Sequence, residues 1–273
     1  MPSPGQWPKV AAAWELVGSP LRPDAEDVAL VKAASDDWGS ATSRPPRVLI
    51  LGVTPELYGL AWPTGTVVRA VDRTKQMLSE VWPGDPKDAV HADWLEMDWP
   101  DDSFDLVLCD GGWSLLDLPG QHLLARRLAK IIAPDGRFVA RLFVPPSRRE
   151  MPEEVLASLT DGGIRDLNCL KLRLGMALMP SPLEGVELGE VWRRLHDVAG
   201  SWPALAAHAG WDLDHLSVID AYRDSTARYH FITVDEFEAT MCESPAEFAT
   251  HRVDVPRYLM GDQCPTVVMR RLP

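Results

Sequence analysis

The sequence lacks the features that mark membrane and secreted proteins. No apolar run approaches the ~18 residues of a membrane-spanning helix, so we expect no membrane span. The first ten residues hold four prolines and glycines but no apolar segment typical of a signal peptide. The four cysteines form no C-x-x-C pair; they are Cys109, Cys169, Cys242 and Cys264. Free thiols in a reducing compartment are the simplest interpretation, which predicts a cytoplasmic protein.

Positive charge is also scarce. Lys and Arg total 27 against 40 Asp and Glu, which gives a net charge of −13 with neutral histidines. A field of this sign repels phosphate backbones. The basic residues are scattered, and their longest clusters are pairs such as Arg126-Arg127. The sequence therefore predicts that the protein has no nucleic-acid partner.

Metal-binding patterns and repeats are missing as well. The seven histidines form no pair at metal-ligand spacing, so we expect no metal site. What is present is a chain of 273 residues, 46% apolar and 25% charged, which is the composition of an ordinary globular protein. Its length suggests one large domain or one domain with an insert.

The first 45 residues are predicted to form a helical cap. Apolar residues spaced by three or four predict a helix over 6–17; they are Trp7, Val10, Trp14 and Val17. Asp24 is a typical N-cap for a second helix over 25–38, whose first turn holds two acids near the positive end of the helix dipole. Residues 39–46 are rich in turn formers and are predicted to be a linker.

Apolar segments alternate with helical segments from residue 47 onward. The predicted strands are 47–52, 66–72, 89–91, 104–110 and 136–144, and the clearest intervening helix is 121–132. This alternation predicts a parallel sheet with helices on both faces. Ligands of such sheets bind beyond the carboxyl ends of the strands. In this chain those ends hold Gly52, Asp72, Asp93 and Asp110.

The alternation stops after residue 144. Residues 146–227 are predicted to be a mostly helical insert, long enough to need packing of its own. Thr233 then caps a short helix over 234–241, and two strands follow near 249–255 and 265–271. A closing hairpin predicts a last strand that is antiparallel to the rest of the sheet.

Four motifs in this region resemble a class I S-adenosylmethionine-dependent methyltransferase. The resemblance covers about 47–144 and 228–272, and its most specific part is the fourth strand "FDLVLCDGG" followed by a helix and the turn Pro134-Asp135-Gly136. It implies a Rossmann-like seven-stranded α/β fold with S-adenosylmethionine as cofactor. The cofactor-binding core would be 46–145 with 228–273, and 146–227 would form a substrate lid.

The first loop departs from the family pattern, acid-x-Gly-x-Gly-x-Gly. Ile50 stands at the position of the acid, and Thr54 and Glu56 replace the second and third glycines. The resemblance implies that Gly52, Val53, Thr54, Pro55 and Glu56 contact the methionine part of the cofactor. Glu56 supplies the missing charge for the methionine ammonium, or it is only a first-turn acid favoured by the helix dipole.

The other motifs imply contacts with the nucleoside. Asp72, followed by Arg73, would accept hydrogen bonds from the ribose hydroxyls; the alternative is a strand-end cap. Asp93 and the backbone amide of Trp94 would meet the adenine edge, with Met77 against its face. The alternatives are a loop acid beside a buried tryptophan, and a core methionine.

The turn after the fourth strand is expected to lie at the reactive end of the ligand. Asp110, Gly111 and Gly112 allow close approach of the backbone, or they form an ordinary turn. Trp113 and Tyr229 are predicted to line the acceptor pocket. For a general base His230 is the only weak candidate, and a structural histidine is the alternative for it, as it is for His122.

These observations predict methyl transfer to a small-molecule acceptor, with no nucleic-acid or membrane partner. Transfer from a sulfonium can run largely on proximity and orientation, so no base is required. A non-catalytic binding or scaffold protein with the same fold remains an alternative, as does a methyltransferase acting on proteins. A nicotinamide oxidoreductase is disfavoured because G-x-G-x-x-G is absent. The sequence does not predict the oligomeric state.

Overall fold

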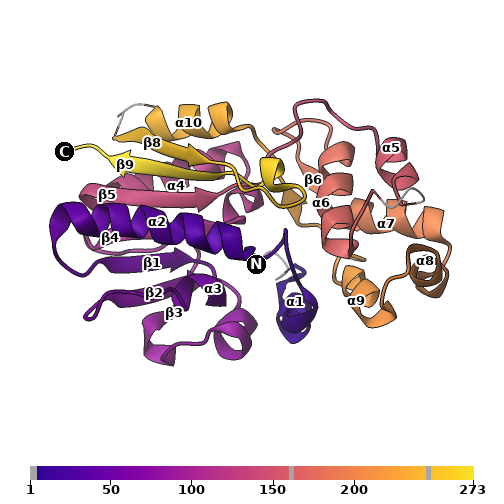
Figure 1. Cartoon of the computed structure of the whole chain (residues 1–273), viewed down its shortest axis with the longest axis horizontal. Helices are drawn as coiled ribbons and strands as arrows, with labels where there is room; N and C mark the ends of the chain where they lie inside the picture. Colours follow the sequence, from indigo (N-terminus) through magenta and orange to yellow (C-terminus); the bar gives the residue numbers. More distant parts are fainter. Residues whose placement is uncertain (1–4, 160–162, 244–246) are drawn as a thin grey trace.

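The structure is a computed structural model that describes residues 5–159, 163–243 and 247–273. Part of the predicted N-terminal cap (residues 1–4) and part of the predicted insert (residues 160–162) lie outside these ranges. A seven-stranded sheet in the order β3-β2-β1-β4-β5-β9-β8 forms the centre (Figure 1). Its strands are β1 (Arg47–Leu51), β2 (Val67–Asp72), β3 (Ala89–His91), β4 (Phe104–Asp110), β5 (Ile132–Arg141), β8 (Phe248–Asp254) and β9 (Thr266–Arg271). β9 is antiparallel to both neighbours, which confirms the predicted fold class.

Helices cover both faces of the sheet because the central strands are apolar on both sides. In β1, Val48 and Ile50 pack with α2 (Ala25–Thr42) and α3 (Pro55–Tyr58), together with a π-helical turn, Met77–Val81. Leu49 and Leu51 face the other way, toward α4 (Leu118–Ile131) and α10 (Val234–Cys242). An unbroken apolar run is therefore what a strand buried on both faces requires.

The N-terminal helices differ from their predicted ends. The first is shorter than expected: α1 (Trp7–Ala12) is followed by a 3₁₀ turn, Trp14–Leu16. The second extends past the predicted linker start to Thr42, and ends where Ser43 adopts a left-handed conformation. Asp24 begins that helix with the predicted N-cap contact, since its carboxylate accepts from the backbone of Glu26. Residues 39–42 of the expected linker therefore form the last turn of this helix.

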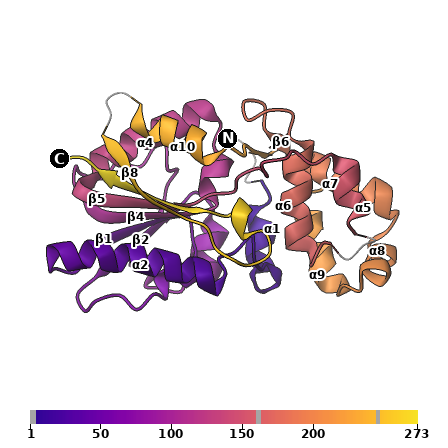
Figure 2. The same ribbon diagram turned by 45° about the horizontal axis from the view of Figure 1, so that its top comes forward.

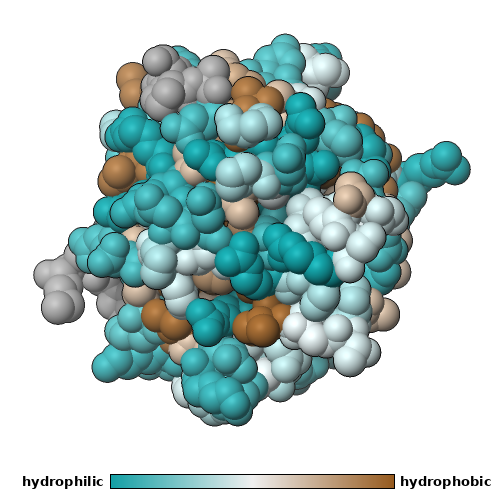
Figure 3. Space-filling model, turned by 90° about the vertical axis from the view of Figure 1, so that its left-hand side faces the viewer, coloured by the Kyte–Doolittle hydropathy of each residue, from teal (hydrophilic) through white to brown (hydrophobic). Residues whose placement is uncertain are grey.

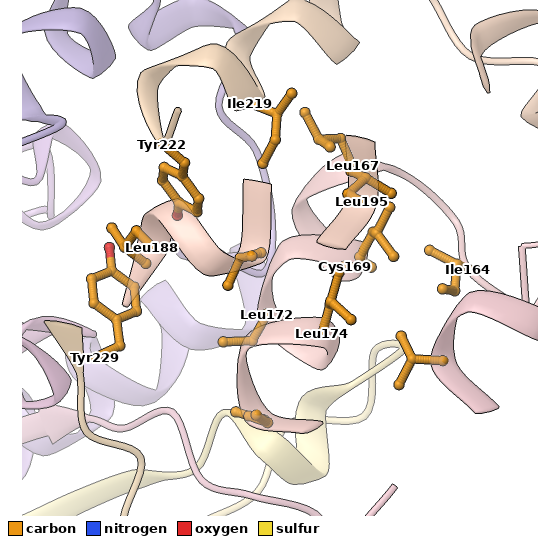
Figure 4. Packing of buried hydrophobic residues seen from close by; sticks show 14 of the residues in the cluster. Ile164, Leu167, Cys169, Leu172, Leu174, Leu188, Leu195, Ile219, Tyr222 and Tyr229 are labelled. Carbon is orange, nitrogen blue, oxygen red and sulfur yellow. The ribbon is translucent and has the colours of Figure 1, made fainter. Parts of the chain in front are cut away.

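The segment 146–227 packs into a helical body beside the carboxyl edge of the sheet (Figures 1 and 2). Its helices are α5 (Pro152–Ala157), α6 (Leu167–Leu178), α7 (Leu188–Ala199), α8 (Trp202–Ala209), α9 (Leu213–Ser217) and a 3₁₀ helix, Val218–Ala221. A two-stranded sheet that the sequence did not predict joins β6 (Val186–Glu187) to β7 (Arg228–Tyr229). Figure 4 shows leucines of α6 packed among other buried residues of this body.

The surface at the amino ends of the strands is largely hydrophilic, with apolar residues scattered rather than gathered (Figure 3). In the part of the chain that the structure describes, no helix combines the length and apolarity needed to cross a bilayer. All four cysteines are unpaired, and three of them are buried.

Asp105 anchors the chain at the amino end of β4. Its carboxylate accepts hydrogen bonds from the guanidinium groups of Arg44 and Arg47, at 2.7–3.1 Å, and from the Arg47 backbone at 2.8 Å. These contacts hold the Asp105 pKa well below its usual range, although burial opposes them. Asp105 thereby ties the linker after α2 and the start of β1 to the amino end of β4.

We expect Asp105→Asn to lower the free energy of unfolding at pH 7 by about 1–3 kcal/mol, because Arg44 and Arg47 lose a buried, charged acceptor. The folded-state pKa lies below the unfolded value of about 3.9, so this contribution is complete above about pH 5 and disappears as the pH falls below about 4. Denaturant unfolding at several pH values measures it. Asp101→Asn, at an exposed acid near Lys130, is the control; an equal loss in both variants would contradict the assignment.

Candidate functional site

The residues that end the parallel strands meet in one pocket, which we call the strand-end pocket. Its lining includes residues 51–54 after β1, 72–74 after β2, 93–94 after β3 and 110–112 after β4. The chain crosses back from β3 to β4 on the far side of β1, so the pocket lies at the topological switch point of the sheet. α1 lies between this edge and α6 (Figure 2), and both helices also contribute to the lining.

The floor of the pocket is built on the carbonyl of Val71. This oxygen accepts from the backbone N–H of Gly52 and from the indole N–H of Trp94, both at 2.8 Å. Gly52 has a φ of 91°, a conformation that favours glycine. An added Cβ there would lie 3.4 Å from the Trp94 ring. The glycine of the first loop and the tryptophan of the third motif are thus held against each other.

Asp72 lies at the end of β2 and lines the pocket. Its Oδ1 accepts from the backbone N–H of Thr74 at 2.6 Å. A Cβ on Gly52 would be 3.8 Å from its Oδ2. Burial raises the Asp72 pKa, and hydrogen bonds from the backbone and side chain of Thr74 oppose that shift. The carboxylate is therefore a strand-end cap that also lines the pocket.

The remaining nucleoside candidates surround this acid. Asp93 lines the pocket; its Oδ1 accepts from the Leu95 backbone at 2.9 Å, and its Oδ2 lies 3.7 Å from the Arg73 guanidinium. Arg73 and Met77 also line the pocket. Met77 is buried and packs in the core, and it also lines the pocket.

The glycines after β4 are required by neighbouring aromatic rings. Gly111 has a φ of 62°, and a Cβ there would come within 2.5 Å of the Phe143 ring. A Cβ on Gly112 would come within 2.6 Å of Trp94 and 3.0 Å of the Cys109 sulfur. Both glycines line the pocket, but protein atoms are enough to explain why these positions have no side chain.

Glu56 does not line the pocket, and neither does Pro55, which corrects two of the expected cofactor contacts. The Glu56 carboxylate is bound by the Arg22 guanidinium, with Nε 2.7 Å and Nη2 2.6 Å from Oε1. Arg22 also donates to the carbonyls of Trp14 and Val17. Glu56 therefore fixes the N-terminal segment to the first loop.

Asp110, at the end of β4, lines the pocket together with Asp72 and Asp93. Its Oδ1 accepts from Nε of the buried Arg141 at 2.5 Å, and Oδ2 has no hydrogen-bond partner in the described part of the chain. Arg141 also donates to the carbonyl of Pro20 at 2.8 Å and lies 3.6 Å from Asp27. Burial raises the pKa of Asp110, and the charge of Arg141 opposes this shift.

The walls of the pocket combine an apolar surface with one polar end. The apolar surface includes Trp7, Val10, Trp14, Val17, Leu21, Leu115 and Phe143. The polar end consists of Gln6, Lys171, Tyr222 and Tyr229. Of these four residues, only Tyr229 was predicted from the sequence to line a pocket. The signal that could have identified this end was Lys171, a lysine between leucines in a predicted apolar helix.

Three predicted residues lie elsewhere. Trp113 does not line the pocket: its ring is buried against Phe237, with centroids 4.8 Å apart, on the face covered by α4 and α10. His230 is buried outside the pocket, with Nδ1 2.8 Å from the carbonyl oxygen of Pro182. His122 lies beside Glu243, away from the pocket. Each of these three side chains contacts a neighbouring residue of the protein.

The leucines and methionines of residues 170–179 hold the helical body together. Leu170, Leu172, Leu174, Met176 and Met179 are buried in its own hydrophobic cluster. No group of three or more His, Cys, Asp or Glu side chains in the described residues is arranged to hold a metal ion.

Comparison with known proteins finds a matching family model. Residues 52–140 match the family model described as a methyltransferase domain. The match spans the pocket-forming strand ends from Gly52 through Asp110 to β5. Residues 52–140 are therefore similar to a class I, S-adenosylmethionine-dependent methyltransferase domain. S-adenosylmethionine is the cofactor of this family.

Solved structures resemble this chain over nearly its whole length. A chain from Rhodobacter sphaeroides, provisionally described as a Zn-dependent alcohol dehydrogenase, has 15% identity and a TM-score of 0.59 and covers 96% of this chain and 98% of its own. The CcbJ methyltransferase from Streptomyces caelestis has 15% identity and a TM-score of 0.54, with coverage of 97% and 96%. The PH0226 protein from Pyrococcus horikoshii OT3 has 10% identity and a TM-score of 0.53, with coverage of 96% and 99%. At these identities the likeness is one of fold. No curated protein matches the sequence.

We expect Gly112→Ala to lower the free energy of unfolding of the protein by about 1–3 kcal/mol, because the new methyl group overlaps Trp94. Gly39→Ala is the matched control, since nothing lies within 4 Å of a Cβ in that part of α2. It should be neutral or stabilise by up to about 1 kcal/mol through helix propensity. Denaturant unfolding compares the free energies of unfolding of the two variants. Equal stability would mean that the turn shifts at no cost to accommodate the methyl group.

Proposed function

We propose that the protein transfers a methyl group from S-adenosylmethionine to a small-molecule acceptor in the strand-end pocket. The observation that carries this proposal is that one continuous pocket joins the strand-end acids to an apolar wall and to a polar end on the helical body. Such a concave, mostly apolar site with a few polar groups is typical of small-molecule binding. In the proposed division, residues 46–145 and 228–273 hold the cofactor, while 1–45 and 146–227 enclose the acceptor.

The residues present fit the nucleoside of the cofactor. Asp72 ends β2 and its carboxylate lines the pocket, at the place where a carboxylate would receive the ribose hydroxyls. Asp93, Met77 and the Trp94 ring border the adjacent part of the pocket, where an adenine ring would find an acceptor, a thioether and an aromatic surface.

The methionine part would be held by Asp110 rather than by Glu56. Asp110 and Glu56 each bind one arginine and keep one carboxylate oxygen without a hydrogen-bond partner among the described residues, but only Asp110 lines the pocket. A carboxylate in a partly apolar site favours an ammonium strongly, because little water screens the pair. Asp110 therefore takes over the charge that Ile50 does not provide in the first loop.

When bound, S-adenosylmethionine supplies an electrophilic methyl group on a sulfonium. The work of the protein is to orient the acceptor and exclude water, and orientation alone can account for a large part of such a rate. α1 and the helical body form the wall opposite the sheet, with Trp7, Trp14 and Tyr222 among the residues facing the pocket.

Charge and shape support a small acceptor in a cytoplasmic setting. The net charge of −13 disfavours nucleic acid, and the pocket is enclosed by side chains from three parts of the chain. A basic protein substrate or a binding role without catalysis are outcomes that the transfer experiment below distinguishes.

Asp72→Ala should weaken S-adenosylmethionine binding by roughly 1.5–3 kcal/mol, the contribution of hydrogen bonds to a charged group. Isothermal titration calorimetry measures the loss. Asp85→Ala is the matched control, because Asp85 also accepts from a backbone N–H two residues on but lies on an exposed turn. An unchanged dissociation constant in folded Asp72→Ala would remove Asp72 from the site.

Asp110→Asn should weaken S-adenosylhomocysteine more than an analogue in which hydrogen replaces the amino group, by about tenfold or more. Asp27→Asn loses a contact with the same Arg141 but does not line the pocket, so it should affect both ligands equally. Glu56→Gln should also lose affinity for both ligands equally. If Glu56→Gln alone discriminated between the ligands, Glu56 would be the acid that meets the ammonium.

The proposed activity itself is tested by transfer of a radiolabelled methyl group to a fractionated metabolite extract. Label in a low-molecular-weight product that depends on intact Asp72 supports the proposal. Label in protein would point to a protein substrate. Tight cofactor binding without transfer to any fraction would favour the non-catalytic alternative.

A further inference from the structure

The polar end of the strand-end pocket has no part in holding the cofactor. Its central residue is Lys171, on the side of α6 that faces the pocket. The residue is 5% exposed, yet it lines the pocket. Its ammonium makes no hydrogen bond or ion pair with any residue in 5–159, 163–243 or 247–273. The ammonium lies beside the Tyr222 ring, whose centroid is 5.2 Å from Nζ.

An ammonium without a charged partner is unusual in such surroundings. Burying a charge is costly unless it is paired, and a cation–π contact offsets only part of that cost. Asp166, the acid nearest along α6, is already engaged by the Arg165 guanidinium and the Cys169 backbone. The pocket acids Asp72, Asp93 and Asp110 lie at the strand ends. A bound anion would give Lys171 the partner that the described residues lack.

The protonation of Lys171 suits this role near neutral pH. Burial lowers its pKa to about 8, and the charge of Asp166 opposes the shift. The other titratable groups beside it are Tyr222 and Tyr229, whose pKa values are raised by burial, so both remain neutral hydroxyls. At pH 7 the polar end therefore carries one positive charge.

The two tyrosines add hydrogen-bond donors beside this charge. The Tyr229 hydroxyl accepts from Gln6 Nε2 at 3.3 Å and from the Tyr222 hydroxyl. Figure 4 shows the two hydroxyl groups directed toward each other. Because the Tyr229 oxygen accepts from both, its own proton remains free to be donated to a ligand. An ammonium with a hydroxyl donor next to it is matched to an oxyanion.

The space next to these groups is apolar and aromatic, bordered by Trp7, Trp14 and Phe143. Flat rings stack well on such walls. An acceptor that satisfies both surfaces has an aromatic body and one acidic oxygen. An amine acceptor fits less well, since it would bring positive charge toward Lys171.

We propose that the polar end, centred on Lys171, recognises a phenol-type hydroxyl of an aromatic acceptor as its phenolate. The inference rests on the proposed function, because it names the acceptor class of the same site. On binding, the acceptor O–H bond breaks and its electron pair stays on oxygen. The proton goes to Nζ when the amine is neutral, and to solvent when Lys171 is already an ammonium.

The test uses 4-nitrophenol, whose phenolate is yellow, and its methyl ether 4-nitroanisole, which cannot ionise. At a pH one unit below the solution pKa of the probe, the full-length protein should bind 4-nitrophenol as the phenolate. It should also prefer it to 4-nitroanisole by about tenfold or more, the strength of a charge-assisted hydrogen bond. Difference absorbance and competition titration measure both quantities.

Three variants sharpen the test. Lys171→Met should lose the phenolate spectrum and the preference, because the charge is gone. Lys171→Arg should keep both, because the charge remains. Lys87→Met is the matched control, at an exposed lysine paired with Asp85, and should behave as the wild type. In the wild type the preference should decline as the pH rises above about 8.

The outcomes separate this inference from the proposed function. Binding of 4-nitroanisole as tight as that of 4-nitrophenol, or a phenolate spectrum retained in Lys171→Met, would overturn the inference. Titration with S-adenosylhomocysteine and thermal unfolding of each variant show whether the fold and the cofactor site are intact. If Lys171→Met does not fold, Lys171→Arg and the pH dependence decide. A phenolate preference without cofactor binding would overturn the proposed function and leave this inference standing.

Discussion

The strand-end pocket depends on the buried guanidinium of Arg141. This residue ends β5, binds Asp110 of β4, and reaches the carbonyl of Pro20 and the carboxylate of Asp27 in the N-terminal segment. A buried cation in such a position must be surrounded by acceptors, so the N-terminal segment is drawn onto the carboxyl edge of the sheet. Burial lowers the pKa of Arg141, but the charges of Asp110 and Asp27 and the Asp110 hydrogen bond outweigh burial, so the pKa is raised and the guanidinium stays charged. The wall formed by α1 is in place because that segment is held there.

Periodicity and strand composition were sufficient to predict the sheet. The continuous apolar runs in β1 and β4 indicate burial on both faces, and a parallel order then fixes where their carboxyl ends meet. Element ends were harder to predict. Helix α2 continues through Gly39 and Ser40 because its hydrogen bonds and the packing of Trp38 outweigh weak local propensities. The β6–β7 pair is two residues long in each strand, too short for any periodic signal.

The residues of the site also differ in whether the sequence could predict them. Asp72, Asp93 and Asp110 could be predicted because each directly follows a strand, and topology alone brings them together. Lys171 and Tyr222 come from the helical body, and their position depends on how that body packs against α1, which no local pattern encodes. Glu56 shows the reverse case. Its place in the first loop suggested a ligand, but Arg22, 34 residues earlier, captures its carboxylate.

The glycine-poor first loop is compatible with a working pocket for a steric reason. Gly52 remains where φ is positive and the Trp94 ring is close. Thr54 has a φ of −130°, an ordinary extended conformation, and Glu56 lies in the first turn of α3; neither backbone requires glycine. Glycine has therefore been kept where the backbone demands it and replaced where it does not. Under the proposed function, the charge absent at Ile50 is supplied one strand away by Asp110, on the neighbouring strand β4.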